Sequence, residues 1–541
     1  MAIVRMILAQ RRLLVVCLVL VILGLFGIAF AAPSAAAQKV ELSVDASKTG
    51  AKINRNLFGQ FAEHLGHGIY EGIWVGPNST IPNTRGIRND VVAALKAIKV
   101  PNVRWPGGCF ADEYHWRNGI GPADKRTITL NPNWGGVIEP NTFGTHEFMD
   151  FIDQIGADAY ISVNVGSGTP REASEWLEYL TTAQQTTLAK EREANGHPAP
   201  YRVGYLGVGN ETWGCGGNMT PEYYLSQLKI YSHFVRNFNP AQQEKDQMRK
   251  IAVGPGGGGP QWEEWTETIM QAHQQHPWSW DMDGLSLHSY TVVKWPPAFK
   301  SMEFAEGEYA QILKSTLEMD DLIHKHSAIM DKYDPQKKVA LVVDEWGAWY
   351  APLPGSNPGF LAQQNSLRDA ILAALNLNIF ARHADRVRGA NIAQMINVLQ
   401  AMIMTDKEKM VLTPTYHVFK MYVPFQDATF VPVTFNAGTY THGDITLPRV
   451  DAIAAKDKAG KLWLEVTNVD PNQPVEIALN VAGIAARSAA GEALTAPKVD
   501  SINTFSAPNT VAPKPVSVKA QGGGKLTVKL EPKSVTVISV E

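Results

Sequence analysis

The chain has 541 residues, of which 45% are apolar and 19% are charged, with a formal net charge of −3. This length allows two domains, and the composition is typical of a globular protein. A charge so close to zero indicates no nucleic acid or other polyanion as a partner. Three cysteines exclude a disulfide-rich scaffold.

The first 37 residues predict an export signal. Arg5, Arg11 and Arg12 are followed by an uninterrupted apolar run at 13–32, and residues 35–37 offer a small-residue cleavage site. Because the apolar run is long, an uncleaved membrane anchor is the alternative. We therefore expect a periplasmic or secreted protein, which stays attached to the membrane if the segment is retained.

Residues 51–405 predict a (β/α)₈ barrel, because short apolar runs alternate with amphipathic stretches. The stretches with helical periodicity include 89–98, 145–156, 221–239 and 365–384. The eight candidate strands are 56–62, 100–106, 158–166, 203–210, 250–256, 283–289, 339–345 and 389–397. A doubly wound open sheet is the rival fold, but no G-x-G-x-x-G motif follows the first strand.

The pattern changes after residue 405. Residues 462–481 consist of two apolar runs around an Asp-Pro-Asn turn, and residues 525–541 alternate with a period of two. Both patterns are typical of antiparallel strands, so 406–541 predicts a β-sandwich. Residues 39–47 alternate in the same way, and we expect the segment 38–50 to contribute a strand to that sandwich.

A glutamate stands at the end of each of two candidate strands. Glu211 ends the fourth and Glu345 ends the seventh, and each is close to a tryptophan. The carboxyl ends of parallel barrel strands meet at one mouth, so the two side chains are expected to face one cleft. Retaining glycoside hydrolysis requires such a pair about 5 Å apart, one ionised for attack and one protonated for donation.

Three motifs extend this interpretation: "RWPGGCFADEYHWRNGIGP" at 104–122, "GNETWGCGG" at 209–217 and "DEWGAWY" at 344–350. They resemble the motifs of glycoside hydrolase family 51, the α-L-arabinofuranosidases, and the similarity runs from about residue 54 to the end of the chain. The resemblance implies a barrel joined to a C-terminal β-sandwich. It also implies exo-acting removal of terminal arabinofuranosyl residues from hemicellulose or pectin side chains.

The resemblance also implies roles for individual residues. Glu211 is expected to be the general acid/base and Glu345 the nucleophile, while Asn210 would bind the sugar 2-hydroxyl. The other residues expected to contact the sugar or orient the nucleophile are Glu63, Arg104, His288, Tyr290, Trp346, Gln394 and Cys109. Among these, the Tyr290 hydroxyl would bond to the nucleophile and Trp346 would form a wall of the pocket.

Cys109 departs from the family pattern, because many relatives carry Asn at this place. A thiol is a poor hydrogen-bonding group, so this position is interpreted as subtype variation that alters substrate preference. Cys215 is the other cysteine after residue 37. A disulfide between the two is open, and we favour free thiols. Asp344 precedes the nucleophile, so strand alternation predicts that it points toward the helices.

No metal or cofactor is expected, because Glu63, His64 and His67 are too loosely spaced to form a metal site. The expected partner is an arabinose-containing polysaccharide or oligosaccharide. Relatives often assemble as hexamers, so the resemblance leaves a homo-oligomer open. Two alternatives remain: an endo-β-1,4-glucanase or a xylanase/β-xylosidase on the same barrel, and a non-catalytic carbohydrate-binding barrel.

Overall fold

The computed structural model describes residues 38–239, 241, 247–275 and 280–541. Eight parallel strands form a closed barrel in the spatial order β10-β11-β12-β13-β2-β5-β8-β9. The strands are β2 (Gly59–Phe61), β5 (Asn102–Trp105), β8 (Asp158–Val163), β9 (Val203–Val208), β10 (Arg249–Ala252), β11 (Gly284–Thr291), β12 (Ala340–Ala348) and β13 (Val387–Ile392). The predicted (β/α)₈ barrel is therefore confirmed, and each strand overlaps one predicted segment.

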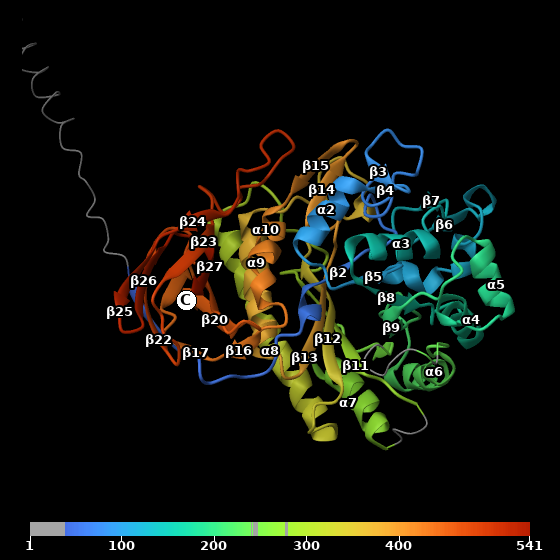
Figure 1. Cartoon of the computed structure of the whole chain (residues 1–541), viewed down its shortest axis with the longest axis horizontal. Coiled ribbons are helices and arrows are strands. Elements are labelled where there is room, and N and C mark those ends of the chain that lie inside the picture. The colour runs from blue at the N-terminus through green and yellow to red at the C-terminus, as the bar shows by residue number, and fades with distance from the viewer. Residues whose placement is uncertain (1–37, 240, 242–246, 276–279) are drawn as a thin grey trace, which may run out of the picture. The chain divides into compact units, whose positions relative to one another are not determined.

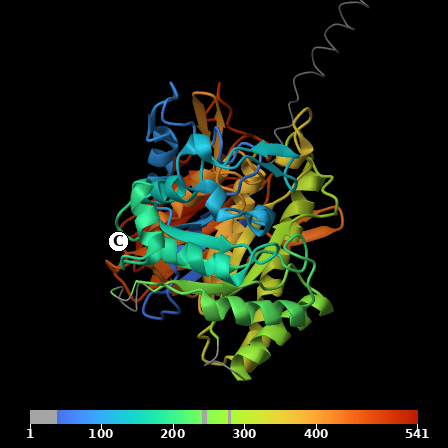
Figure 2. The ribbon, with the colours of Figure 1, turned by 90° about the vertical axis from the view of Figure 1, so that its right-hand side faces the viewer.

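Helices surround this barrel (Figures 1 and 2), and the long α8 is yellow-green in both views. Their bounds are α2 (Asn89–Ala97), α3 (Thr145–Ile155), α4 (Pro170–Thr181), α5 (Thr187–Ala194), α6 (Pro221–Phe234), α7 (Pro260–Gln275), α8 (Glu306–Tyr333), α9 (Leu367–Arg382) and α10 (Pro414–Met421). Three of them, α4, α6 and α10, begin at a Thr-Pro pair. The threonine hydroxyl accepts a backbone N–H bond, and proline suits the first helical position.

The helix predicted at 221–239 ends five residues early, at Phe234. Val235 adopts an extended conformation, and the Asn237 side chain accepts a hydrogen bond from the backbone N–H of Asn239. Asparagine side chains compete in this way with helical hydrogen bonds. The chain therefore leaves the helix at this point, although its apolar residues continue the helical periodicity.

Strand β1 and the C-terminal strands form two sheets that pack face to face, in which most neighbouring strands are antiparallel. One sheet has the order β17-β1-β22-β26-β25, and the other has the order β16-β20-β21-β27-β23-β24. The first consists of β17 (Val433–Phe435), β1 (Gln38–Asp45), β22 (Val475–Ala482), β26 (Lys525–Leu530) and β25 (Val518–Gly522). The second consists of β16 (Thr429–Val431), β20 (Val450–Lys456), β21 (Leu462–Asn468), β27 (Ser534–Val540), β23 (Ala489–Leu494) and β24 (Lys514–Val516).

Alternation places one face of each strand in the sandwich core. In β1, the side chains of Val40, Leu42 and Val44 are buried against the same apolar cluster as Leu464 and Ile538 of the second sheet. The exposed residues between them face solvent. This period-two burial is the physical basis of the strand pattern in the sequence.

Helix α9 lies between the barrel and the sandwich, as Figure 1 shows. Residues 367–381 of this helix are all buried, because it contacts β12 on one side and β20, β21 and β27 on the other. A helix buried on all sides needs partners for its polar groups. Asn378 Nδ2 supplies one such link by donating to Glu465 Oε2 at 2.6 Å and to Asp451 Oδ2 at 2.9 Å.

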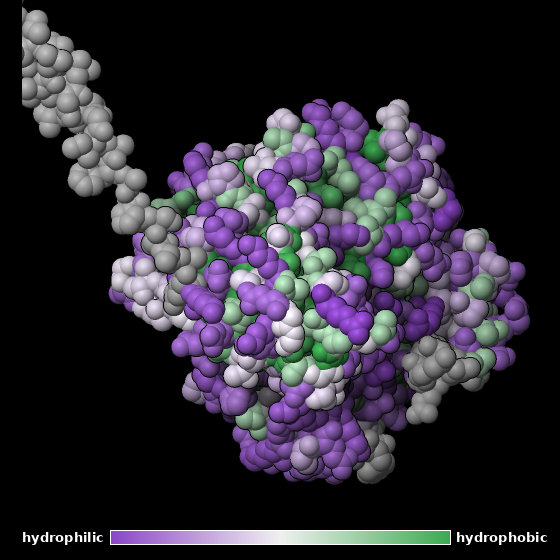
Figure 3. Space-filling view, turned by 60° about the vertical axis from the view of Figure 1, so that its left-hand side comes forward, coloured by the Kyte–Doolittle hydropathy of each residue, from purple (hydrophilic) through white to green (hydrophobic). Residues whose placement is uncertain are grey.

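The face shown in Figure 3 is mostly hydrophilic, with hydrophobic residues in small patches. Within the described part of the chain, no helix combines the length and the apolar character that crossing a membrane requires. The predicted signal or anchor at residues 1–37 lies outside the described residues.

Candidate active site

Glu211 and Glu345 meet at the carboxyl ends of the barrel strands. Glu211 follows β9, and Glu345 lies within β12, which is separated from β9 by β10 and β11 in the ring. One oxygen of each carboxylate and one nitrogen of His288 all lie within 4.8 Å of one another. This proximity suits a pair in which one carboxylate attacks directly, because an inverting pair stands wider to admit a water molecule.

Glu345 is buried among hydrogen-bond donors. Arg104 Nη1, from β5, donates to Glu345 Oε1 at 2.8 Å, and the Tyr290 hydroxyl, from β11, donates to Oε2 at 2.7 Å. His288 Nδ1 lies 3.5 Å from Oε1. These groups stabilise negative charge on Glu345 and hold its carboxylate in one orientation.

Glu211 occupies a different environment. Its backbone adopts a left-handed conformation with φ of 38°, which costs a non-glycine residue about 1–3 kcal/mol. Oε1 contacts His288 Nδ1 at 2.9 Å, and a fifth of the side chain is exposed at the pocket. Burial raises the pKa of Glu211 above its ordinary value, and the charge of Glu345 adds to this increase, although the His288 hydrogen bond opposes both.

His288 joins three carboxylates. Its Nδ1 faces Glu211, and its Nε2 lies 3.2 Å from Asp344 Oδ1. Burial alone would lower the pKa of His288, but the charges of Glu345 and Asp344 and the hydrogen bond to Glu211 outweigh burial and raise the pKa to about 10. This pKa favours the imidazolium form at neutral pH, in which Nδ1–H donates to Glu211 Oε1 and Nε2–H forms an ion pair with Asp344.

The prediction that Asp344 points toward the helices is wrong. Asp344 lies inside the barrel, where the Tyr160 hydroxyl donates to its Oδ2 at 2.7 Å. The reason is a β-bulge, because β12 carries one extra residue between Val342 and Glu345 relative to β11. Two consecutive acidic side chains consequently face inward, and simple alternation fails at this point.

Polar and apolar residues together line the pocket around the two carboxylates. Its lining residues are Glu63, Leu65, Gly108, Cys109, Trp134, Asn210, Glu211, Tyr290, Glu345, Trp349, Leu361, Gln394 and Leu399. Most of the residues predicted to contact sugar are therefore brought together. Arg104 and His288 are not among the lining residues, and they support the carboxylates instead.

Glu63 and Asn210 are held by further polar contacts. Glu63 Oε1 accepts hydrogen bonds from the backbone N–H of Gly108 at 2.9 Å and from the Trp134 indole at 2.8 Å. Gln394 Nε2 donates to Glu63 Oε2 at 2.9 Å. Burial and the charge of Glu345 raise the pKa of Glu63 to about 7. Arg104 Nη2 donates to Asn210 Oδ1 at 2.6 Å, and Asn210 Nδ2 lies 3.8 Å from Cys215 Sγ, so one N–H of the Asn210 amide remains available for a ligand.

The prediction that Trp346 forms a wall of the pocket is wrong. Trp346 is fully buried on the outer side of the barrel, where its ring packs against Phe380 of α9 and Phe419 of α10. Trp349 and Trp134 line the pocket instead. Trp349 is four residues after Glu345, so period-two alternation could have identified it, whereas no sequence signal marked Trp134.

The preference for free thiols is also wrong. Cys109 and Cys215 form a disulfide with a Cα–Cα distance of 5.5 Å, and it closes a sequence separation of 106 residues. The two cysteines follow β5 and β9, which are separated by β8 in the barrel. Sequence alone did not reveal this proximity, because it arises from the closure of the sheet.

The described residues offer little for a metal ion. His64 has both ring nitrogens engaged, Nδ1 with Glu139 Oε2 at 2.9 Å and Nε2 as acceptor from the Trp105 indole at 3.1 Å. Glu211, His288 and Glu345 are close enough to share an ion. However, the imidazolium of His288 and the guanidinium of Arg104 make that position unfavourable for a cation.

Comparison with known proteins identifies relatives along most of the chain. Residues 94–291 match the α-L-arabinofuranosidase 1 domain, and residues 344–534 match the α-L-arabinofuranosidase C-terminal domain. An intracellular exo-α-L-arabinofuranosidase of Bacteroides ovatus is 45% identical over 514 residues, which cover 94% of this chain and 98% of the relative.

Solved structures give the same result. The GH51 arabinofuranosidase of Xanthomonas axonopodis pv. citri is 53% identical, with a TM-score of 0.89 over 93% of this chain and 100% of that one. The α-L-arabinofuranosidase of Thermotoga maritima, solved as an arabinose complex, is 30% identical, with a TM-score of 0.80 and the same coverage.

The expectation of export is contradicted by these relatives. The Bacteroides ovatus protein, which aligns over nearly its whole length, is named an intracellular enzyme. The basic and apolar segment at 1–37 suggested export, but such a pattern is only a compositional signal. We therefore withdraw the periplasmic or secreted assignment.

The family assignment rests on agreement among sequence, fold and site. Matches to two arabinofuranosidase domains together span most of the barrel and the sandwich. The relatives that align over their whole length share this fold. The chain therefore belongs to the α-L-arabinofuranosidases of glycoside hydrolase family 51 and is a glycoside hydrolase.

Proposed function

We propose that this protein is a retaining, exo-acting α-L-arabinofuranosidase, with Glu345 as nucleophile and Glu211 as general acid/base. The observation that carries the proposal is the proximity of two carboxylates, within 4.8 Å, in opposite electrostatic environments. Glu345 is surrounded by donors that stabilise its charge, whereas burial favours the protonated form of Glu211. Retaining hydrolysis uses this division of protonation states.

In the first step, Glu345 Oε attacks the anomeric carbon while the bond to the leaving oxygen breaks. The proton of Glu211 passes to that oxygen, and a covalent arabinosyl-enzyme ester forms. The negative charge on Glu345 is lost in this step. Because that charge helped to raise the pKa of Glu211, the pKa falls as the ester forms.

In the second step, the ionised Glu211 removes a proton from water, and the water oxygen attacks the anomeric carbon. The ester bond breaks, Glu345 recovers its charge and Glu211 recovers its proton. The product therefore keeps the anomeric configuration of the substrate. His288 supports this change of roles, because its hydrogen bond to Glu211 stabilises the ionised form that the second step needs.

The other pocket residues suit a furanose ring with several hydroxyl groups. The remaining N–H of the Asn210 amide is placed to bind the 2-hydroxyl beside the nucleophile. Glu63 offers carboxylate acceptors, and Gln394 Oε1 is buried without a hydrogen-bond partner. A bound sugar hydroxyl would satisfy Gln394, since a buried unpaired polar atom is costly.

The alternative activities are not favoured. The relatives that align over most of the chain are named arabinofuranosidases, and the Bacteroides ovatus protein is named exo-acting. The bifunctional glucanase-xylanase among the structural neighbours is only 15% identical, so it shows a shared fold alone. Both carboxylates are present, which argues against a non-catalytic binding barrel.

The decisive experiment follows product formation from an aryl α-L-arabinofuranoside and from arabinose-bearing polysaccharides. We expect release of single arabinose units, with the first product in the α configuration by ¹H NMR. Release of the β anomer would exclude double displacement, and chain cleavage of a soluble glucan without arabinose release would exclude the proposed substrate. The homo-oligomer suggested by the family resemblance is a separate proposal, which light scattering coupled to gel filtration checks.

A further inference from the structure

The Cys109–Cys215 disulfide connects two loops at the catalytic mouth. Cys109 begins the short helix that follows β5, and Cys215 lies four residues after Glu211 in the loop that follows β9. Strand β8 stands between β5 and β9 in the barrel. The disulfide therefore ties the loop that carries the proposed acid/base to a segment on a different part of the ring.

The Glu211 loop has an irregular backbone. Residues 209–220 contain turns but no helix or strand, and Gly214, Gly216 and Gly217 lie within them. The backbone N–H groups of Gly214 and Gly216 both donate to the Glu211 carbonyl, at 2.7 and 3.1 Å. These bonds shape the turn, and the Trp213 indole donates to the Gly254 carbonyl at 3.1 Å, which attaches the loop to the segment after β10. A left-handed residue such as Glu211 persists only where its surroundings hold it.

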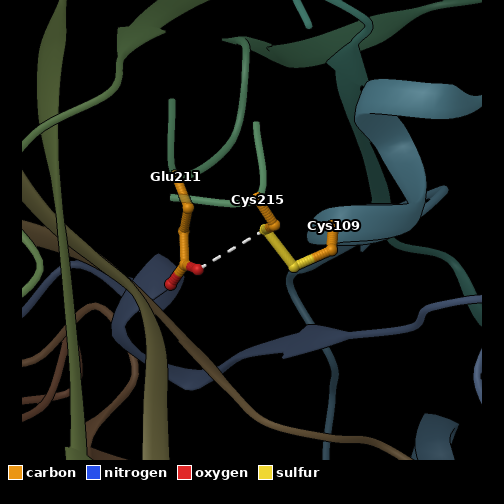
Figure 4. A group of neighbouring side chains, drawn as sticks. All are labelled: Cys109, Glu211 and Cys215. Atoms are coloured by element: carbon orange, nitrogen blue, oxygen red, sulfur yellow. Dashed lines mark hydrogen bonds between the residues drawn. A yellow bond between two sulfur atoms is a disulfide. The ribbon is translucent and has the colours of Figure 1, made fainter. Parts of the chain in front are cut away.

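The disulfide also touches the carboxyl group itself. Cys215 Sγ lies 3.7 Å from Glu211 Oε2. Figure 4 shows the Glu211 carboxyl group beside this sulfur. A disulfide sulfur carries no hydrogen, so this contact is packing and not a donated hydrogen bond. The Glu211 carboxyl group is therefore placed between the His288 ring on Oε1 and the sulfur on Oε2.

The Cys109 end of the disulfide is firmly anchored. Asp112, in the same short helix, accepts hydrogen bonds on Oδ1 from the backbone N–H groups of Val165 and Gly166, at 3.3 and 3.2 Å. Its Oδ2 is buried and faces Gly216, where a Cβ would come within 2.8 Å of that oxygen. The disulfide thus adds an attachment to an anchored segment at the Cys215 end of the Glu211 loop, and close packing at Gly216 reinforces it.

We propose that the Cys109–Cys215 disulfide is a positioning element for the general acid/base, and that breaking it impairs proton donation by Glu211 more than attack by Glu345. This inference rests on the proposed function. Cys215 is exposed, so a dithiol reductant can reach it. The dithiol gives up two electrons and two protons, the S–S bond breaks, two thiols form, and the reductant becomes a cyclic disulfide.

The test compares kcat/KM of the oxidised and the reduced enzyme on two substrates. On an arabino-oligosaccharide, whose leaving group needs a proton, we expect reduction to lower kcat/KM by about 10- to 100-fold, the scale of a small misplacement of a catalytic group. On an aryl arabinofuranoside with a good leaving group, we expect a change below about 3-fold, because that group departs without protonation. A titration of free thiols establishes complete reduction.

Two further measurements separate positioning from general destabilisation. Azide should restore kcat of the reduced enzyme on the aryl substrate, because azide attacks the arabinosyl-enzyme without a general base. The double variant C109S/C215S should reproduce the kinetics of the reduced enzyme and should not respond to the dithiol. If that variant does not fold, reduction and reoxidation of the native chain provide the same comparison.

Equal losses of kcat/KM on the two substrates would overturn the proposal, because they would indicate a general structural role. Unchanged kcat/KM on the oligosaccharide after complete reduction would overturn it as well. An oxidised enzyme that cleaves neither substrate would instead contradict the proposed function, so the two failures are distinguishable.

Discussion

The two catalytic carboxylates are held in different ways. Glu345 belongs to a strand of the barrel and receives hydrogen bonds from Arg104 and Tyr290, which come from two other strands. Glu211 belongs to a glycine-rich loop and is held by His288 and by the contact with a disulfide. The strands of the barrel therefore hold the nucleophile, whereas a loop attached to the barrel holds the acid/base.

The difference corresponds to what each group does in the proposed mechanism. A nucleophile starts every cycle ionised, so fixed donors around Glu345 are useful throughout. An acid/base must be neutral in one step and charged in the next, so a strong fixed donor set would hold it in one state. The Glu211 environment combines burial, which favours the neutral form, with one imidazolium, which favours the charged form.

The largest expected effect comes from Glu345→Gln. Without a nucleophile, no arabinosyl-enzyme forms with any leaving group, so kcat/KM should fall on the order of 10⁵-fold on both aryl and oligosaccharide substrates. Steady-state kinetics measure the loss, and Glu41→Gln, at an exposed position of β1, is the matched control. Retention of more than about a hundredth of the activity would show that another group attacks.

Glu211→Ala should separate the two substrates. The kcat/KM on an arabino-oligosaccharide should fall about 10³-fold, because leaving-group protonation is lost, whereas the value on an activated aryl substrate should change little. Azide should yield an arabinosyl azide that retains the α configuration, as detected by NMR. An azide product of inverted configuration would instead identify Glu211 as the nucleophile.

His288→Gln tests the link between the two carboxylates. The hydrogen bond and positive charge of His288 lower the pKa of Glu211, so their removal should raise it further. Glu211 would then keep its proton to higher pH. The decline of kcat/KM on the basic side of the pH profile should therefore occur at higher pH. The rate at the optimum should drop about 10- to 100-fold through loss of a charged hydrogen bond. A basic limb displaced to lower pH would contradict this assignment.

Trp346→Phe should have the smallest effect on activity. Its ring packs against α9 and α10 outside the pocket, so the substitution should lower the free energy of unfolding by about 1–3 kcal/mol and leave KM within about twofold. Trp349→Phe, at a pocket-lining position, is the matched comparison and should raise KM several-fold. Denaturant unfolding and steady-state kinetics measure the two quantities. A larger rise in KM for Trp346→Phe than for Trp349→Phe would contradict the observed orientations.

Much of the architecture could be predicted from local patterns. Burial of one strand face and one helix face produces periods of two and of 3.6 residues, so eight strands, their alternation with helices and the antiparallel C-terminal strands were all visible in the sequence. Because parallel strands end at one mouth, the positions of Glu211 and Glu345 at strand ends were enough to place them together.

Other features depended on how distant segments meet. A bulge in β12 turned Asp344 inward, and the partner rings of α9 and α10 decided the environment of Trp346. Closure of the sheet brought Cys109 and Cys215 within bonding distance. The sequence by itself determined the repeating elements, because their patterns are set by neighbours along the chain. Only the tertiary structure decided these three contacts, because each depends on register or proximity between residues far apart in the chain.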